Sequence, residues 1–366
     1  MVVAKLIING VAPKFLISNL KRCFMFSEII KERALPPLRS RAEMLEILQK
    51  EEYGYMPPLP EGLTFSDGEE VYPRFGGNKG RYVRIVASGT LYGREFSFPF
   101  YSVIPNKGNK HPFVIHINFR GDMPDRFQPT EEIIDKGFAV FTLCHNDVTM
   151  DNDDFTHGLA GVIYPDGKRN STDPGKIAIW AWAAQRVMDY AYTLGDLLDF
   201  NRAAVCGHSR LGKTALLCAA TDERFTHCYS NDSGCGGASV ARGNKGETVK
   251  NICETFHYWF CGEYKKYIDN EYNMPFDQHY LIASISPRRV MVGSASEDLW
   301  ADPRNEQLSC VAASPAFPKG FIAPDRFAEV DDIFSEGDIA YHLREGTHYF
   351  NRTDWERFTK FLIPNS

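Results

Sequence analysis

A serine at a predicted sharp turn is the first candidate for chemistry in this 366-residue sequence. Residues 203–206 form a short apolar run that predicts a buried strand, and Gly207 and His208 then lead into Ser209. Helix-forming residues follow as far as Ala220. A strand, a sharp turn and a helix in this order would hold the Ser209 hydroxyl outward, where the helix amino terminus favours negative charge. Ser209 is therefore a candidate nucleophile, although the same pattern also fits a serine that only caps the helix.

A serine nucleophile needs a base, and His348 is the best-placed of the ten histidines. It follows a predicted strand at residues 339–343 and precedes a predicted helix at residues 353–362. His342 lies inside the strand pattern, so we expect it to be structural. His208 is too close to the serine in the sequence to act as its base. The positions of these residues therefore predict His348 as the base.

The base in turn needs an orienting carboxylate, and two aspartates each follow a predicted strand. Asp232 comes after the strand at residues 225–231, and Asp298 comes after the strand at residues 289–294. Either aspartate could instead make only a hydrogen bond within a turn. The order of serine, acid and histidine at strand ends favours the catalytic interpretation, and the residues alone leave the choice of acid open.

Two cations accompany the serine on the predicted helix. Arg210 directly follows Ser209 and could offer its backbone N–H and its guanidinium to the oxyanion of a tetrahedral intermediate. Lys213 lies one helical turn further along the same face, as a surface charge or as a donor into the site. A cation this close to a reacting carbonyl favours a polar, oxygen-rich substrate over a lipid.

The elements that must position these residues alternate between strands and helices. The remaining predicted elements are a helix at 40–53 capped by Ser40, an antiparallel strand pair within 81–104, strands at 112–117 and 137–143, and a helix at 176–194 with Trp180 and Trp182 in the core. This alternation predicts a mostly parallel central sheet with helices on both faces, and the strand, turn and helix around Ser209 make an α/β-hydrolase fold, a three-layer sandwich, the expected form of it. We expect residues 1–39 to be an amino-terminal extension and residues 40–366 to be a single catalytic domain.

Two loops of this predicted fold are candidates for the walls of the site. The loop after the strand at 112–117 begins at Asn118 and is expected beside the nucleophile, where it can supply a second oxyanion donor. The aspartate-rich loop at 146–154 is long enough to line a site, and it is equally plausible as a solvated connection.

Composition excludes several other classes of protein. The formal net charge is −6 and no segment is strongly basic, so we expect no nucleic-acid partner. No apolar stretch is long enough to span a membrane, and charged residues and Pro13 interrupt the apolar patches at the amino terminus. We therefore expect a cytoplasmic monomer, or a secreted or periplasmic protein if a leader has been removed. The nine cysteines contain no Cys-x-x-Cys motif and are predicted to be buried thiols.

With these motifs in place, the chain resembles the glucuronoyl esterases of carbohydrate esterase family 15, and their bacterial members more than the fungal ones. The resemblance extends from about residue 110 to the end of the chain, and less clearly back to residue 40. The matching blocks are GHSRLGK at 207–213, DERFTHCYSNDSGCGGA at 222–238, the segment 246–248 leading into 258–260, EDLWADP at 297–303 and YHLREGTH at 341–348. The family accommodates a serine motif without glycine at position 211.

The resemblance implies an activity and a role for individual residues. It implies a serine esterase that cleaves esters of glucuronic or 4-O-methylglucuronic acid on glucuronoxylan, as in ester links between hemicellulose and lignin alcohols. Carried over residue by residue, it makes Ser209 the nucleophile, His348 the base and Arg210 an oxyanion stabiliser. The residues implied to hold the uronate ring are Lys213, Glu247 and Trp300.

The resemblance also places the acid after either of two strands. Asp232 matches the first position and is slightly preferred, although the family often has glutamate there, and Asp298 matches the second. The expected mechanism is a two-step acyl transfer that requires no metal and no organic cofactor. The alternatives are an acetylxylan or other carbohydrate acyl esterase on the same fold, with the sugar on the alcohol side, and a catalytically silent carbohydrate-binding protein.

Overall fold

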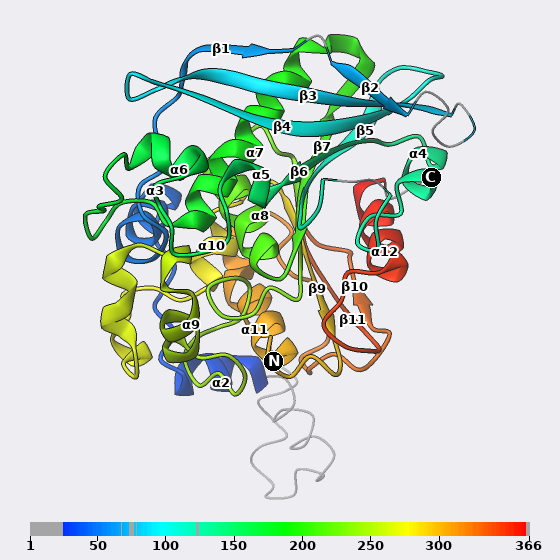
Figure 1. The fold of residues 1–366 in the computed structure, drawn as a ribbon. Helices are drawn as coiled ribbons and strands as arrows, with labels where there is room; N and C mark the ends of the chain where they lie inside the picture. The colour runs from blue at the N-terminus through cyan, green and yellow to red at the C-terminus, as the bar shows by residue number, and fades with distance from the viewer. Residues whose placement is uncertain (1–24, 67, 73–76, 78, 122–123, 364–366) are drawn as a thin grey trace, which may run out of the picture.

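The computed structural model describes residues 25–66, 68–72, 77, 79–121 and 124–363 (Figure 1). Within these residues the chain is organised around one sheet of eleven strands. The strands are β1 (Glu61–Phe65), β2 (Glu69–Tyr72), β3 (Gly80–Leu91), β4 (Arg94–Pro105), β5 (His111–Asn118), β6 (Ala139–Cys144), β7 (Leu198–His208), β8 (His227–Asn231), β9 (Arg289–Ala295), β10 (Ile333–Phe334) and β11 (Ile339–Arg344).

Helices connect most of these strands. They are α2 (Met25–Glu32), α3 (Arg41–Leu48), α4 (Thr130–Asp135), α5 (His145–Val148), α6 (Gly158–Ile163), α7 (Lys176–Thr193), α8 (Arg210–Thr221), α9 (Val249–Phe256), α10 (His279–Ala283), α11 (Pro303–Ala313) and α12 (Arg352–Leu362). The π-helix η2 (Gln49–Tyr53) extends α3, and short 3₁₀ turns such as η5 (His257–Trp259) occupy parts of the loops.

The strand order places the parallel strands together in the middle of the sheet. The order is β1, β3, β4, β6, β5, β7, β8, β9, β11 and β10, with β2 paired to β3. The strands from β6 to β11 in this order pair in parallel, whereas β1 to β4 and β10 pair antiparallel at the two edges. The carboxyl ends of parallel strands share one edge of a sheet, so the loops after β5, β7, β8, β9 and β11 meet there.

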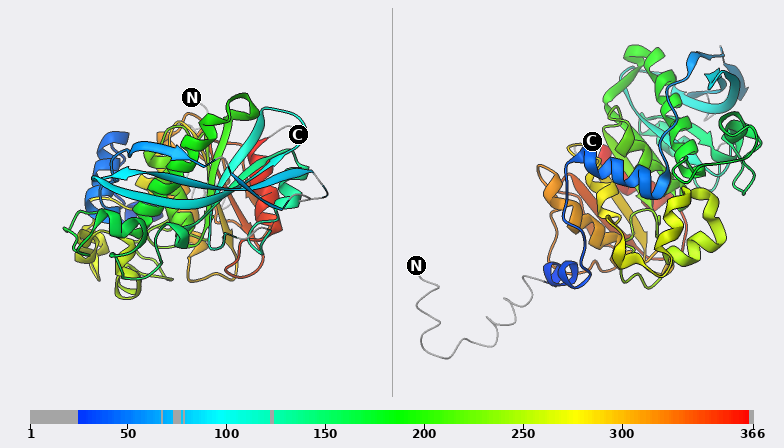
Figure 2. Two further views of the ribbon diagram at one scale, coloured as in Figure 1. Left: turned by 45° about the horizontal axis from the view of Figure 1, so that its top comes forward. Right: turned by 90° about the vertical axis from the view of Figure 1, so that its left-hand side faces the viewer.

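Helices cover both faces of this sheet, as predicted. On β5, Phe113 and Ile115 pack into one apolar cluster with α7 and α8, whereas Val114 faces a second cluster with α4 and α12. Figure 1 and the left view of Figure 2 show α12 on one side of the sheet and α7 and α8 on the other. Because both faces are covered, every residue of β5 and β6 is buried, and buried and exposed positions do not alternate. The predicted α/β-hydrolase fold with three layers is confirmed.

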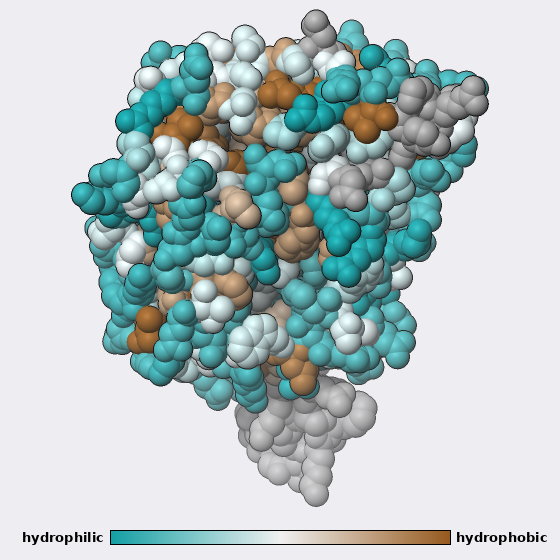
Figure 3. All heavy atoms as spheres, in the orientation of Figure 1, coloured by the Kyte–Doolittle hydropathy of each residue, from teal (hydrophilic) through white to brown (hydrophobic). Residues whose placement is uncertain are grey.

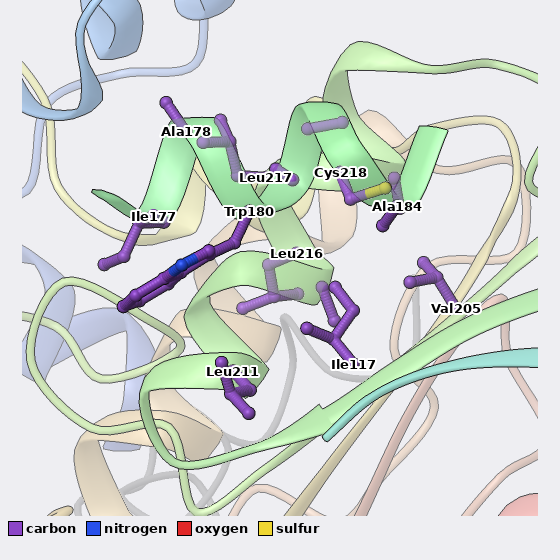
Figure 4. Packing of buried hydrophobic residues seen from close by; sticks show 14 of the residues in the cluster. Ile117, Ile177, Ala178, Trp180, Ala184, Val205, Leu211, Leu216, Leu217 and Cys218 are labelled. Atoms are coloured by element: carbon purple, nitrogen blue, oxygen red, sulfur yellow. The ribbon is translucent and has the colours of Figure 1, made fainter. Parts of the chain in front are cut away.

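The larger cluster holds the helix that follows the serine against the sheet. Leu211 and Leu216 of α8 pack with Trp180 of α7 and Val205 of β7, and all four side chains are buried (Figure 4). Trp180 also donates its indole N–H to the Thr149 carbonyl, 3.0 Å away. The predictions that Trp180 and Trp182 belong to the core are therefore confirmed.

The predicted elements all form, with boundaries that differ by a few residues. The largest difference is in β7, which begins at Leu198 although the apolar run begins at residue 203, because Leu198 pairs with His111 of β5. The edge strands β1, β2 and β10 were not predicted. They are short and partly polar, so it is pairing with β3 and β11, and not an apolar pattern of their own, that makes them strands.

Part of the predicted amino-terminal extension packs on the domain. Phe26 of α2 is buried against Phe327, with ring centroids 5.2 Å apart, and against Val240 and Leu308. The carboxylate of Asp325 accepts hydrogen bonds from the first backbone N–H groups of α2. Residues 1–24 of the extension lie outside the described residues, and the domain boundary at residue 40 stays a prediction.

Several general expectations concern the molecule as a whole. All eight cysteines among the described residues are buried free thiols, and Cys23 lies outside them. No helix within the described ranges is both long and apolar enough to cross a membrane. On the face drawn in Figure 3, hydrophobic residues form small separate groups among hydrophilic ones.

Candidate active site

Ser209 lies at the turn between β7 and α8 with a backbone conformation that is rare for a residue with a side chain. Its φ is 58° and its ψ is −129°, and its side chain makes no capping hydrogen bond to the helix. The interpretation of Ser209 as only a helix cap is therefore wrong. Strained residues of this kind concentrate at functional sites, where the surrounding structure holds them in place.

The glycines around Ser209 explain the form of the motif. A Cβ on Gly207 would lie 2.2 Å from the Leu211 carbonyl oxygen, so only glycine fits two residues before the serine. A Cβ on Gly212 would lie 3.0 Å from both the Ser230 Oγ and the Ser233 Cβ. Leu211 itself points into the core. The second position at which neighbouring atoms leave little room for a side chain is therefore residue 212, which explains why the second glycine of the motif stands there and not at residue 211.

His348 lies beside the serine and is paired with Asp298. The two side chains come from the loops after β11 and β9, and Nδ1 of His348 lies 2.5 Å from Oδ2 of Asp298. The Asp298 side chain is buried, whereas 45% of the His348 side chain is exposed. A buried carboxylate on Nδ1 fixes the orientation of an imidazole and stabilises the imidazolium form.

Asp232, the slightly preferred acid, has other partners. Its Oδ1 accepts a hydrogen bond from the Ala295 backbone N–H at 2.7 Å, and its Oδ2 accepts one from Arg344 at 3.2 Å. Burial raises the pKa of Asp232 well above its usual value, and the neighbouring Glu306 carboxylate adds to the rise. The preference for Asp232 as the partner of His348 is therefore wrong in this structure, because its oxygens face β9 and the guanidinium.

A cation could in principle bind near these groups. Ligand atoms of Asp232, Asp298 and His348 lie within 4.8 Å of one another, the one such group of three among the residues that the structure describes. Asp232 already accepts a hydrogen bond from Arg344, and Asp298 already pairs with His348. The two carboxylates therefore have protein partners that satisfy them.

The residues expected to hold a sugar line one cavity with the serine. It has a volume of about 340 Å³ and is lined by Ser209, Arg210, Lys213, Asp232, Ser233, Gly234, Glu247, Phe256, Trp259, Asp298, Trp300, Ala301 and His348. Lys213 donates to the backbone carbonyls of Ser233 and Cys235, each at 2.6 Å, and lies 3.6 Å from a Glu247 carboxylate oxygen. Trp300 borders the cavity with 55% of its surface exposed.

A second cavity lies beside the same serine and histidine. It has a volume of about 480 Å³ and is lined by Phe119, Arg120, Arg126, Phe127, His208, Ser209, Arg210, His348 and Tyr349. Phe119 and Arg120 come from the loop after β5, which agrees with the expected place of that loop beside the nucleophile. Among the described residues, this lining has the rings of Phe119, Phe127 and Tyr349 and no carboxylate, which distinguishes the second cavity from the first.

Arg210 lines both cavities and is held by neighbours from distant parts of the chain. Its Nη1 pairs with Asp151, and its guanidinium carbon lies 4.9 Å from the centre of the Trp259 ring. Its Nε is buried without a hydrogen-bond partner among the described residues. As the first residue of α8, Arg210 also has a backbone N–H without an acceptor inside the helix. Both donors belong to the residue that directly follows Ser209 and lines the same two cavities.

The two other histidines considered in the sequence have structural places. His208 is buried and its Nδ1–H donates to the Asn231 Oδ1 at 2.7 Å, and burial lowers its pKa well below the usual value. His342 is fully buried and lies 2.9 Å from the Tyr229 hydroxyl. Neither is paired with Asp298, which agrees with the sequence interpretation.

Sequence reasoning missed several residues of the site. Arg344 donates to Asp354, Asp232 and the carbonyls of Thr347 and Tyr349, which flank His348, and so it fixes the histidine loop. Arg344 belongs to the matching block at 341–348, but the resemblance assigns it no role. For Asp151 the only signal was the aspartate-rich loop at 146–154.

A strained serine after a parallel strand, with a paired histidine and aspartate on the loops after later strands, defines an α/β-hydrolase with a serine-centred site. Residues 90–319 match the family model "Glucuronyl esterase, fungi". The chain belongs to this family.

Known proteins and solved structures agree with this assignment. The chain is 39% identical over 250 residues to "Carbohydrate esterase MZ0003" of an unknown prokaryotic organism, covering 66% of this chain and 56% of that one. It is 27% identical to the 4-O-methyl-glucuronoyl methylesterase of Podospora anserina, over 68% of this chain and 49% of the relative. It thus spans about half the length of these relatives.

Among solved structures, a promiscuous CE15 esterase from the marine bacterial metagenome has a TM-score of 0.77 and 30% identity, with 88% of this chain and 90% of that chain covered. The glucuronoyl esterase from Solibacter usitatus has a TM-score of 0.78 and 28% identity, with 88% and 91% covered.

Proposed function

We propose that this protein is a serine esterase that hydrolyses esters of glucuronic or 4-O-methylglucuronic acid at the uronate carbonyl. The observation that carries the proposal is the cavity in which Lys213, Glu247 and Trp300 adjoin Ser209 and His348. Family membership supports the same substrate, because several relatives are named 4-O-methyl-glucuronoyl methylesterase.

The chemistry begins with proton transfer from Ser209 to His348 as the serine Oγ attacks the ester carbonyl. Asp298 accepts the Nδ1 hydrogen bond of His348 and stabilises the imidazolium that forms. The carbonyl oxygen becomes an oxyanion, which Arg210 stabilises through its backbone N–H and its unpartnered Nε. His348 then gives the proton to the departing alcohol, which leaves a uronoyl ester on Ser209.

Water completes the reaction by the reverse sequence. His348 takes a proton from the water, which attacks the uronoyl ester, and the second tetrahedral intermediate has its oxyanion at the same donors. Collapse of this intermediate returns the proton to Ser209 and releases the free uronate. The groups that move protons and stabilise charge in these two steps are Ser209, His348, Asp298 and Arg210.

The first cavity suits the acyl sugar. The Lys213 ammonium is fixed by two backbone carbonyls and lies beside the Glu247 carboxylate, so the pair offers a donor and acceptors to ring hydroxyls. The exposed Trp300 ring provides an apolar surface for one face of the ring. The second cavity, lined by Phe119, Phe127 and Tyr349, then receives the alcohol, and its aromatic walls suit a lignin-type alcohol.

The experiment that tests this function compares three esters with the same enzyme preparation. Wild type and Ser209→Ala are assayed with benzyl glucuronate, acetylated xylan and 4-nitrophenyl acetate. We expect a preference for benzyl glucuronate and a loss of all turnover in Ser209→Ala. A preference for acetylated xylan would contradict the substrate, and turnover that survives in Ser209→Ala would contradict the nucleophile. No turnover of any ester would favour a carbohydrate-binding protein without activity.

A further inference from the structure

Asp151 reaches the site from the aspartate-rich loop between α5 and α6. Its Oδ2 accepts a hydrogen bond from Nη1 of Arg210, and its Oδ1 accepts one from the Trp259 indole N–H at 2.6 Å. The Tyr258 hydroxyl donates to its backbone carbonyl at 3.3 Å. Its side chain is only 11% exposed. The carboxylate is therefore fixed from two sides before any substrate binds.

The charge of Asp151 is as well defined as its position. Burial alone would raise its pKa, but the His145 ring 3.8 Å away, the charge of Arg210 and the hydrogen bond from the Trp259 N–H together lower the pKa to about 2. Asp151 is thus ionised throughout the pH range in which an esterase is assayed. An ionised carboxylate makes a stronger hydrogen bond to a guanidinium than a neutral group does.

Arg210 needs such a partner because its side chain is long and lies between two cavities. Only 28% of it is exposed, and the rings of Trp259, Phe119 and Phe256 surround the guanidinium within 6 Å. Stacking on rings restrains the plane of a guanidinium but leaves it free to turn within that plane. The bond from Nη1 to Asp151 removes this rotation.

The fixed orientation has a consequence for the opposite edge of the guanidinium. Its Nε is buried without an acceptor, and an unpaired buried donor costs about 1–3 kcal/mol. An arginine free to rotate would relieve this cost by bonding elsewhere. With Nη1 held, the Nε–H stays unpaired in the residue that lines the cavity next to Ser209.

We propose that Asp151 is a positioning residue for ester hydrolysis, which holds Arg210 so that the guanidinium donates to the oxyanion. The inference rests on the proposed function. Asp151 acts through Arg210 and contacts no substrate. Its role therefore differs from that of Asp298, which acts on the base.

The test is a double-mutant cycle of Asp151→Asn and Arg210→Ala, assayed with benzyl glucuronate. Because loss of one oxyanion donor costs about 10²–10³ in kcat, we expect Asp151→Asn to lower kcat by roughly 10- to 100-fold with KM changed by less than about threefold. In the Arg210→Ala background we expect Asp151→Asn to have no further effect, since the residue through which it acts is gone. Asp151→Glu, which keeps the charge, should recover part of kcat.

Asp153→Asn is the matched control, because it makes the same change two residues away. Asp153 is exposed and pairs with His257 outside the cavities, so we expect unaltered kinetics. An equal loss on adding Asp151→Asn to wild type and to Arg210→Ala would overturn the proposal, since it would mean a general structural effect. An unchanged kcat in Asp151→Asn would overturn it as well.

The cycle does not depend on the identity of the acyl group. If wild type cleaves 4-nitrophenyl acetate but not the glucuronate, the proposed substrate fails, and the same cycle with the acetate still tests Asp151. If no ester is cleaved, the rate at which a fluorophosphonate labels Ser209 replaces turnover. We then expect Asp151→Asn to slow labelling in the wild-type background and to have no further effect in the Arg210→Ala background. No labelling of wild type would overturn both proposals.

Discussion

At the residue scale, the central question is which carboxylate orients His348. Asp298 and Asp232 both follow parallel strands and both lie near the imidazole, but only Asp298 bonds to Nδ1. The difference comes from the backbone, since Asp232 has a φ of 45° and turns its carboxylate toward β9 and Arg344. Sequence position could give both candidates, but it could not give the direction of either side chain.

Exchange of the two aspartates for asparagine separates their roles. We expect Asp298→Asn to lower kcat for benzyl glucuronate by about 10²- to 10⁴-fold, because the imidazole loses its orienting charge. We expect Asp232→Asn to lower kcat by less than about 10-fold, because Asp232 bonds to Ala295 and Arg344 and makes no hydrogen bond to His348. Steady-state kinetics of the two variants measure this, and a larger effect in Asp232→Asn would assign the acid to Asp232.

Trp300 offers a test of the acyl cavity without damage to the core, because it is exposed. Stacking on an aromatic ring contributes about 0.5–1.5 kcal/mol, so we expect Trp300→Ala to raise KM for benzyl glucuronate by roughly 3- to 10-fold. The kinetics with 4-nitrophenyl acetate should not change, since acetate is too small to reach the ring. An equal effect on both esters would show that Trp300 does not recognise the sugar.

At the element scale, the turn between β7 and α8 is the feature that the sequence predicts best. The apolar strand, the glycine two residues before Ser209 and the helix that follows are local signals, and a local pattern is sufficient to identify them. Asp151 and Trp259 are different, because they reach Arg210 from loops 59 and 49 residues away in the chain. Such contacts depend on the path of irregular loops, which no periodicity encodes.

Substitution of the two glycines at this turn tests how tightly the elements are packed. Gly207→Ala would bring a Cβ within 2.2 Å of a backbone carbonyl, whereas Gly212→Ala would meet two serine side-chain atoms at 3.0 Å. We expect Gly207→Ala to lose more than about 2 kcal/mol of stability and most of its activity, and Gly212→Ala to lose less of both. Thermal unfolding and ester hydrolysis of the two variants measure the difference, and equal losses would contradict it.

At the scale of the whole molecule, the fold buries acidic groups that make stability depend on pH. Glu52 of η2 is fully buried, and burial raises its pKa from 4.5 to about 8, although a hydrogen bond from Gln278 opposes the rise. One of its carboxylate oxygens has no partner among the described residues. The folded protein therefore keeps a proton on Glu52 that the unfolded chain releases near pH 4.5.

Because the folded-state pKa is the higher one, the contribution of Glu52 to stability is largest below about pH 4.5 and declines as the pH rises towards 8. Glu52→Gln cannot ionise, so we expect its unfolding temperature to fall less between pH 5 and pH 8.5 than that of wild type. Differential scanning calorimetry at several pH values measures both. Parallel curves for the two proteins would mean that Glu52 is ionised in the folded state.

Part of this whole-molecule architecture can be predicted from the sequence. The succession of strands and helices along the chain, the two covered faces of the sheet and the positions of Ser209 and His348 at strand ends follow from apolar runs and chain order. The edge strands and the packing of α2 on Phe327 do not, because they depend on partners that lie elsewhere in the chain.

The central claim is that Ser209 accepts a uronoyl group from an ester. Rapid acid quenching of the enzyme with benzyl glucuronate, followed by mass spectrometry of the peptide that contains Ser209, tests it directly. The account predicts that this peptide gains the mass of one glucuronoyl group and that Ser209→Ala gains none. Turnover of the ester with no adduct on the Ser209 peptide, or an adduct on another residue, would contradict it.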